Sequence, residues 1–232
     1  MTYREMLTMV KKKSTENDLG SANLMGTYVW YPLSYPVTYW LLNKKITPNQ
    51  VSLLSLISCL IGFGFLSLSH TLWGRLIGVT GFLIWSILDC VDGNLARVRK
   101  QFSPIGDLWD AAAGYAAICL MFFGIGASGF DHTGRWAYYC VLLGALSGIF
   151  TLYPRLLMHF KYHGEDNEVN NKLNYGLAKK IVFNITSPDC LVIPLMYVAV
   201  GLKLEFLFTL AYCAMNFVIC LYGSYSVLKE EK

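Results

Sequence analysis

Long apolar runs separated by short polar connections dominate the chain from about residue 47 onward. Each run is close to the ~20 residues that a helix needs to cross the hydrocarbon core of a bilayer. Because the runs are continuous and do not alternate strictly, they predict α-helices and exclude a transmembrane β-barrel. The sequence therefore predicts an all-α integral membrane protein, a bundle of six transmembrane helices. The predicted spans are residues 47–69, 72–98, 105–127, 135–158, 187–202 (the shortest) and 205–228.

Polar and aromatic segments precede the first apolar run, and one polar stretch interrupts the later runs. Residues 28–45 carry two Trp and four Tyr, are broken by Pro32 and Pro36, and end in two lysines. Aromatic side chains with a polar tip favour the headgroup layer, so this segment is predicted to lie along the membrane interface, although a bent loop packed on the bundle remains an alternative. Residues 1–16 form either a short basic amphipathic helix or a frayed tail. Residues 159–186 are predicted to be a polar cytoplasmic loop with an amphipathic helix near 172–183.

These segments divide the chain into three parts. Residues 1–45 are predicted to be a cytoplasmic and interfacial N-terminal segment, residues 46–228 the six-helix transmembrane domain, and residues 229–232 a cytoplasmic tail. The motif "ITPNQVS" marks the start of the first span, with Thr47 as the N-cap and Pro48 at the first helical position.

Composition and charge agree with a membrane protein and predict its orientation. Apolar residues make up 55% of the 232 residues and charged residues 15%, against about 45–50% and ~25% in soluble domains. Sixteen of the 19 Lys and Arg residues lie on one side of the predicted topology, so both termini and the 88–110 region are predicted to face the cytoplasm. The net charge of +4 then reflects topology and contact with membrane lipid, and nucleic acid is not an expected partner.

Carboxylates gather where the second and third predicted spans meet, in "LDCVDGNLARVRKQFSPIGDLWDAAAG", residues 88–114. Positions three and four apart share one face of a helix. Asp89, Asp92, Gly93 and Ala96 are therefore expected to form one stripe near the cytoplasmic end of the second span. Arg97 lies just beyond this stripe.

A second stripe follows the break at Ser103-Pro104. Gly106 and Asp110 share one face of the third span, with Gly114 next along it and Asp107 nearby. Two helices joined by a short turn are antiparallel neighbours, so the two stripes are expected to face each other.

Several carboxylates in one cavity repel one another unless they are protonated or neutralised by cations. Oxygen ligands suit hard cations such as Mg²⁺ or Mn²⁺, and Mg²⁺ usually completes its shell with water and substrate phosphate. The substrate is therefore predicted to be a phosphate ester or pyrophosphate, with Arg97 available to its oxygens. Alternatively, the aspartates could form hydrogen bonds between helices or interfacial salt bridges. This alternative explains one or two of the aspartates better than it explains three together.

The series Asp89, Asp92, Gly93, Ala96 and Arg97, followed after eight residues by Gly106 and then Asp110, resembles the signature of the CDP-alcohol phosphatidyltransferase family. The "TPNQVS" start and the six-span layout are also similar, so the resemblance covers at least residues 46–228.

The resemblance implies that an acceptor attacks the β-phosphate of a CDP-alcohol, with CMP as the leaving group. It implies that Asp89, Asp92 and Asp110 hold one or two Mg²⁺ or Mn²⁺ ions. It implies further that Asp92, Gly93, Ala96 and Arg97 bind the nucleotide. The expected partners are a CDP-alcohol donor and a lipid or polar alcohol acceptor, and the resemblance also suggests a homodimer.

Gly114 departs from the family pattern because the final aspartate of the motif, thought to be the general base, belongs there. The chain could use another proton acceptor, or a nucleophile that needs little deprotonation, or it could be catalytically impaired. Asp107 is the nearest substitute in sequence, but it lies about two turns away. The favoured hypothesis is a natural subgroup in which Gly114 leaves room for an unusual or larger acceptor.

Two further alternatives remain open. Arg155, near the cytoplasmic end of the fourth span, could bind an acceptor phosphate or could be a topology anchor. A cation transporter is the alternative from another functional class, since intramembrane acids can form an ion path. The acids cluster at one face and no repeated halves are evident, which argues against a transporter.

Overall fold

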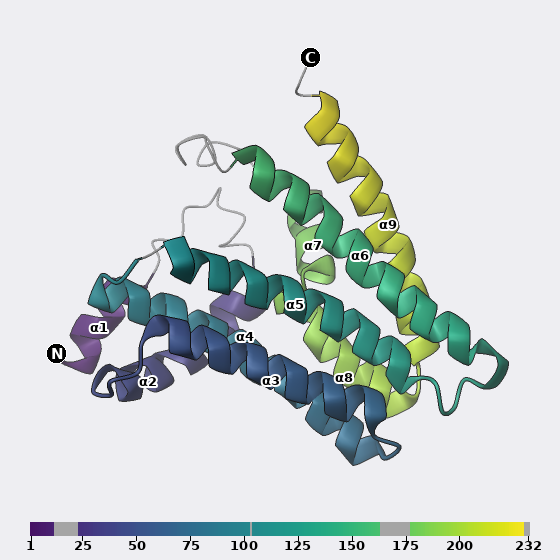
Figure 1. Cartoon of the computed structure of the whole chain (residues 1–232), viewed down its shortest axis with the longest axis horizontal. Helices are drawn as coiled ribbons and strands as arrows, with labels where there is room; N and C mark the ends of the chain where they lie inside the picture. Colours follow the sequence, from purple (N-terminus) through teal and green to yellow (C-terminus); the bar gives the residue numbers. More distant parts are fainter. Residues whose placement is uncertain (12–22, 103, 163–176, 230–232) are drawn as a thin grey trace.

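The computed structural model describes residues 1–11, 23–102, 104–162 and 177–229, and every regular element in these ranges is helical. Figure 1 shows their arrangement. In chain order the elements are α1 (Tyr3–Val10), η2 (Gly26–Trp30), α2 (Tyr31–Leu42), α3 (Pro48–Leu68), α4 (Leu72–Arg99), α5 (Pro104–Ser128), η3 (Gly134–Trp136), α6 (Ala137–Tyr162), α7 (Leu177–Thr186), η5 (Pro188–Val192), α8 (Ile193–Leu202) and α9 (Glu205–Lys229).

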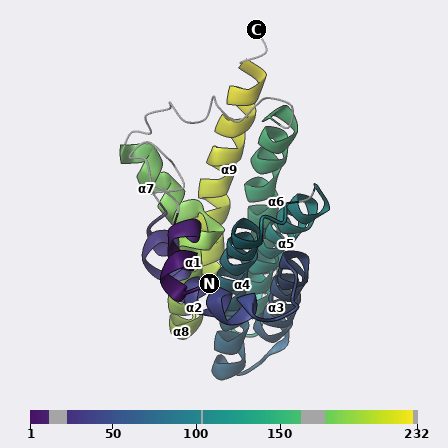
Figure 2. The same ribbon diagram turned by 90° about the vertical axis from the view of Figure 1, so that its left-hand side faces the viewer.

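The long helices form two connected groups. Helices α3, α4 and α5 run side by side, whereas α6 and α9 run together toward the C-terminus at an angle to the first group (Figures 1 and 2). Helix α3 packs along both α4 and α5, and α6 packs along both α5 and α9. Small residues permit this close approach, because a Cβ atom added at Gly81 of α4 would lie 2.5 Å from the Cα of Gly62 in α3.

Five described helices are long and apolar enough to cross a membrane, and they lie within α3, α4, α5, η3–α6 and α9. They agree with five of the six predicted spans. The fifth predicted span, residues 187–202, corresponds to η5 and α8, which join the end of α7 across a bend of 52°. The chain therefore has five or six candidate spans. The helix predicted near 172–183 is found as α7 at Leu177–Thr186, and residues 172–176 lie outside the described range.

The N-terminal segment is helical and packs against the bundle. Helix α1 begins with a capping box formed by Thr2 and Glu5, and it buries Met6 and Val10. The aromatic segment predicted along the interface forms η2 and α2, and α2 packs against α4. Arg99 at the end of α4 fastens the connection from α2 to α3, because its guanidinium donates to the backbone carbonyls of Leu41, Leu42, Lys44 and Ile46.

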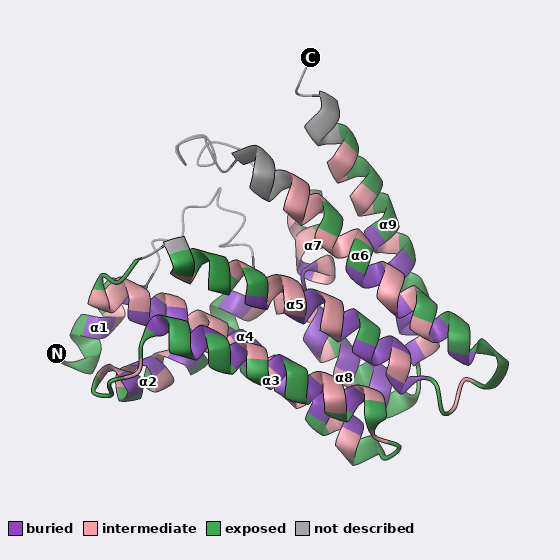
Figure 3. Ribbon diagram, in the orientation of Figure 1, coloured by how far each residue is buried: buried purple, intermediate pink, exposed green. Residues whose placement is uncertain are grey.

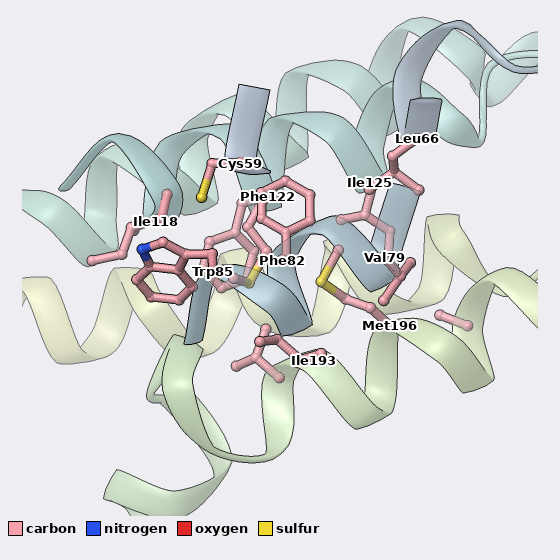
Figure 4. Packing of buried hydrophobic residues seen from close by; sticks show 14 of the residues in the cluster. Cys59, Leu66, Val79, Phe82, Trp85, Ile118, Phe122, Ile125, Ile193 and Met196 are labelled. Carbon is pink, nitrogen blue, oxygen red and sulfur yellow. The ribbon is translucent and has the colours of Figure 1, made fainter. Parts of the chain in front are cut away.

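The largest buried apolar cluster lies where α3, α4, α5 and α8 meet (Figure 4). Phe82, Phe122 and Met196 are fully buried there. The outward faces of the long helices carry exposed large apolar side chains, such as Leu60 of α3 and Val218 of α9 (Figure 3). An apolar outer face around an apolar core is expected of a bundle whose solvent is lipid. The chain is therefore a multi-pass membrane protein.

A polar network joins the helices at the end of the bundle where α5 leads into η3. The imidazole Nε2 of His132 lies 2.7 Å from Oε2 of Glu205, whose side chain is fully buried. Arg75 of α4 donates to Asp131 at 2.7 Å and lies 3.2 Å from Nδ1 of His132. These contacts connect α4, the α5–η3 loop and α9.

Candidate active site

A cavity of about 470 Å³ opens between the N-terminal segment, α4, α5 and η5. Its volume falls in the range of small-molecule sites. Three predicted site carboxylates, Asp89, Asp92 and Asp110, line it together with Gly93 and Arg97. The helical stripes predicted from spacing alone therefore do face a common space.

The three carboxylates have different surroundings. Asp92 is buried, and its Oδ2 accepts a hydrogen bond of 2.5 Å from Ser52 Oγ of α3. Asp89 is half-buried and lies close enough to Asp110 for the two carboxyl groups to interact. Two carboxyl groups this close repel each other unless a proton or a cation lies between them.

The chemistry of this donor set fits a hard divalent cation. All three side chains offer only oxygen ligands, and Mg²⁺ commonly takes one or two carboxylates and completes its shell with water and substrate phosphate. No three acidic, His or Cys side chains in the described ranges are already drawn together as a complete ligand set. Ser52 holds the carboxylate of Asp92 by a hydrogen bond, whereas Asp89 and Asp110 interact with each other.

Arg97 is held in place through an asparagine that sequence analysis did not select. Its Nη2 donates to Asn94 Oδ1 at 2.8 Å, and Asn94 Nδ2 donates to Ser34 Oγ and Thr38 Oγ1 of α2 at 3.0 and 3.3 Å. Arg97 Nε and Ser86 Oγ are buried without a hydrogen-bond partner among the described residues. Both residues line the larger cavity, so a polar ligand there would satisfy them.

A second cavity of about 130 Å³ lies beside the first, against the start of α3 and of α5. Ala96, Gly106 and Asp107 line this smaller cavity and do not line the larger one. Four residues line both cavities: Asp92, Gly93, Arg97 and Asp110. The residues predicted to bind the nucleotide therefore lie at the junction of the two cavities or in the smaller one.

Gly114, the position where the motif lacks its last aspartate, is half-buried in α5 one turn beyond Asp110. A Cβ atom added there would meet no other heavy atom within 4 Å. Close packing therefore does not require a glycine at this position, in contrast to Gly81.

The similarity to known proteins covers the motif residues and the helices that carry them. A model of the CDP-alcohol phosphatidyltransferase family matches residues 45–222. The chain belongs to this family. The resemblance inferred from the aspartate motif is confirmed, and the match begins after the N-terminal segment.

Curated relatives in this family carry transferase names. A bifunctional IPC transferase and DIPP synthase of Rubrobacter xylanophilus is 36% identical over 107 residues, which cover 46% of this chain and 23% of that protein. Cholinephosphotransferase 1 of Gallus gallus is 27% identical over 126 residues, covering 49% and 37%. Cholinephosphotransferase 1 of Homo sapiens is 32% identical over 75 residues, covering 31% and 18%. The matched regions thus span less than two fifths of these relatives.

A further carboxylate in the cavity was not predicted. Asp189, at the start of η5, lines the larger cavity with the motif aspartates of the family. Its Oδ2 accepts a hydrogen bond of 2.7 Å from Asn23 Nδ2, and its backbone carbonyl accepts one of 2.6 Å from Trp30 Nε1. The available signal was an aspartate at the beginning of the fifth apolar run, but nothing in its spacing connects it with residues 89–110.

Arg155, considered for an acceptor phosphate, lines neither of the two cavities. Its Nη2 donates to Ser187 Oγ at 3.3 Å, so it reaches the residue that precedes η5. Arg155 therefore lies near the wall that carries Asp189.

Two tyrosines of α2, Tyr31 and Tyr35, complete the larger cavity. Burial raises the pKa of the Tyr31 phenol to about 12 and also raises the pKa of Tyr35. Both phenols are consequently neutral at physiological pH, and they can donate hydrogen bonds to a ligand but are poor proton acceptors.

Proposed function

We propose that the protein transfers a phospho-alcohol group from a CDP-alcohol to an acceptor with release of CMP. The observation that carries this proposal is the shared cavity of Asp89, Asp92 and Asp110. Arg97 also lines this cavity, and its Nε has no hydrogen-bond partner among the described residues. The names of the relatives, cholinephosphotransferase and IPC transferase, support the transfer of a phospho-alcohol. The identity of the alcohol and of the acceptor is left to experiment.

In this proposal Asp89, Asp92 and Asp110 hold Mg²⁺ or Mn²⁺, which neutralises phosphate charge when bound. Arg97 binds phosphate oxygens through the fork of its guanidinium, which Asn94 orients. Gly93 and Ala96 leave space for the nucleotide because they carry little or no side chain. Ser52 fixes the carboxylate of Asp92 by its hydrogen bond.

The reaction is a displacement at the β-phosphorus of the donor. An acceptor oxygen forms a bond to this phosphorus, and the bond to the oxygen that bridges to the α-phosphate breaks. CMP leaves with that electron pair, and the alcohol becomes joined to the acceptor through a phosphodiester. Positioning and charge neutralisation dominate catalysis of such transfers.

We further propose that the cavity and both termini face the cytoplasm, where the positive-inside bias places them. Exposed apolar faces such as that of α3 contact lipid or a second copy in a homodimer. The N-terminal segment, residues 1–45, belongs functionally to the site, because Tyr31 and Tyr35 line the cavity.

Gly114 supports one alternative, a catalytically impaired member that still binds a CDP-alcohol. A cation carrier is less well supported, because the three aspartates line one cavity together with Arg97, whose guanidinium suits phosphate oxygens. Metal-dependent CDP binding would discriminate between the two functions, since a carrier has no reason to recognise CDP.

The test is CMP release by the purified protein with Mg²⁺ or Mn²⁺ across a panel of CDP-alcohols and acceptors. We expect Asp92→Asn to lower CMP release by at least about 100-fold, since it removes one charged ligand from the metal. Asp131→Asn, the same chemical change in the remote α5–η3 loop, is the matched control and is expected to retain activity. Metal-dependent CDP binding without CMP release from any pair would favour the impaired member.

A further inference from the structure

The proposed transfer requires a group that accepts the proton of the acceptor hydroxyl. Position 114, where the family motif places its last aspartate, holds a glycine. Asp107 lines only the smaller cavity, and the phenols of Tyr31 and Tyr35 stay protonated. Asp89, Asp92 and Asp110 are assigned to the metal. For a hydroxyl acceptor, the remaining candidates among the described residues therefore lie elsewhere in the larger cavity.

Among the described residues that line this cavity, Asp189 is the remaining carboxylate. It is half-buried and close enough to Asp89 to interact with it electrostatically. It belongs to η5 and follows the end of the motif, position 114, by 75 residues in the sequence. Its position thus depends on the fold and not on the helical spacing of the motif.

The side chain of Asp189 has a fixed orientation. Asn23 Oδ1 accepts a hydrogen bond of 2.6 Å from the backbone N–H of Gly26, so Asn23 Nδ2 is the group that donates to Asp189 Oδ2. Asn23 is buried, and the Trp30 indole holds the Asp189 backbone. Within the described part of the chain, no hydrogen bond occupies Asp189 Oδ1. One carboxylate oxygen is therefore anchored while the other stays available to a ligand.

A second observation indicates that a polar ligand occupies this space. Ser86 is 3% exposed and lines the same cavity, yet its hydroxyl has no hydrogen-bond partner among the described residues. A buried hydroxyl without a partner costs stability, so such groups are normally satisfied, here by a bound hydroxyl or phosphate oxygen.

We propose that Asp189 is the catalytic base that replaces the missing motif aspartate. This inference rests on the proposed transferase function. In the step, the proton of the acceptor hydroxyl moves to Asp189 Oδ1 while the acceptor oxygen forms its bond to the β-phosphorus. The bond from this phosphorus to the bridging oxygen breaks, and CMP leaves with the electron pair.

The first test is Asp189→Asn, assayed with the donor and acceptor pair on which the wild type is active. An asparagine at 189 can still accept the hydrogen bond from Asn23 but cannot take up a proton. We expect kcat to fall about 10²–10⁴-fold, the usual contribution of a general base. Metal-dependent CDP binding should stay within about threefold of the wild type. Asp131→Asn, outside the cavity, is the matched control.

The second test is rescue by Gly114→Asp in the Asp189→Asn protein. The space around position 114 accepts a side chain, so a carboxylate there is expected to restore turnover at least about tenfold, as a general base should. A purely structural role of Asp189 would not be repaired from α5. A double variant as slow as Asp189→Asn would therefore overturn the proposal.

The remaining outcomes separate this inference from the proposed function. Wild-type turnover in Asp189→Asn would overturn the base role and leave the transferase function intact. Loss of metal-dependent CDP binding in Asp189→Asn would make Asp189 a binding residue and also overturn the base role. A wild type that releases no CMP from any pair would overturn the proposed function and the base role together.

Discussion

At the scale of single residues, Ser52 shows how a motif carboxylate obtains its orientation. Its hydroxyl donates a hydrogen bond of 2.5 Å to Asp92 Oδ2 across the α3–α4 contact. Groups that orient metal ligands without touching the metal typically change metal affinity by about 10–100-fold when they are removed. Ser52 is therefore expected to be a positioning residue for the proposed metal site.

Ser52→Ala is expected to raise the Mg²⁺ concentration needed for half-maximal CDP binding about tenfold. Titration of CDP binding with Mg²⁺ measures this shift, whereas CDP affinity at saturating Mg²⁺ should change little. Ser55→Ala is the matched control, since Ser55 is a fully buried serine of the same helix that donates only to the Ser52 backbone carbonyl. An equal shift in both variants would refute the positioning role.

Sequence reasoning identified the candidate site residues that are close together in the sequence. It missed those that only the fold brings to the cavity. Asp89, Asp92 and Gly93 follow from the spacing of one helix, and Asp110 follows from the short turn to the next. Asn94 lies in the middle of the same motif and was passed over, because its partners Ser34 and Thr38 are on α2, about 60 residues earlier.

At the scale of elements, Asn94 is one of the contacts that join α2 to α4, the motif helix. Its Oδ1 accepts a hydrogen bond from Arg97, and its Nδ2 donates to two hydroxyls of α2. The docking of α2 and the orientation of the Arg97 guanidinium are therefore linked through one buried side chain.

Asn94→Ala is expected to weaken metal-dependent CDP binding about tenfold or more, because a hydrogen bond to a charged group contributes about 1.5–3 kcal/mol. Isothermal titration with CDP and Mg²⁺ measures the loss. Asn216→Ala is the matched control, since buried Asn216 of α9 donates to Ser147 of α6 away from the cavity. Both variants should unfold at lower temperature, but only Asn94→Ala should bind CDP more weakly.

The fifth predicted span, residues 187–202, begins directly after a bend in the chain. The apolar run coincides with η5 and α8, and the chain bends by 52° between α7 and η5. Ser187, immediately before Pro188, has an extended backbone with ψ of 127°, as expected for a residue preceding proline. The proline was visible in the sequence, and the helix that precedes the bend had been predicted near 172–183, but the angle between α7 and η5 does not follow from the apolar pattern.

At the scale of the whole molecule, the end of the bundle opposite the motif is held together by charge. Glu205 is fully buried, and its Oε2 lies 2.7 Å from His132 Nε2. Its Oε1 has no hydrogen-bond partner in the described part of the chain. A buried carboxylate is costly unless it is paired, so this contact bears on the stability of the bundle and not on the chemistry.

Glu205→Gln is expected to lower the free energy of unfolding by about 1–3 kcal/mol, the range for a disrupted buried polar pair. Thermal unfolding in detergent measures the effect, and CDP binding by the folded fraction should remain unchanged. Glu5→Gln, at the exposed capping box of α1, is the control, because glutamine can also serve in that box. Reduced CDP affinity in Glu205→Gln would show that the two ends of the bundle are coupled.

The cavity walls span the chain from Val10 to Asp189, which has a consequence for biosynthesis. Translation delivers α2 and the motif helices well before it delivers η5. Until Pro188–Val192 leaves the ribosome and reaches the bundle, the side of the cavity that Asp189 closes stays open. The nascent carboxylates of α4 and α5 thus keep contact with water during membrane insertion, when the cost of dehydrating them would be greatest.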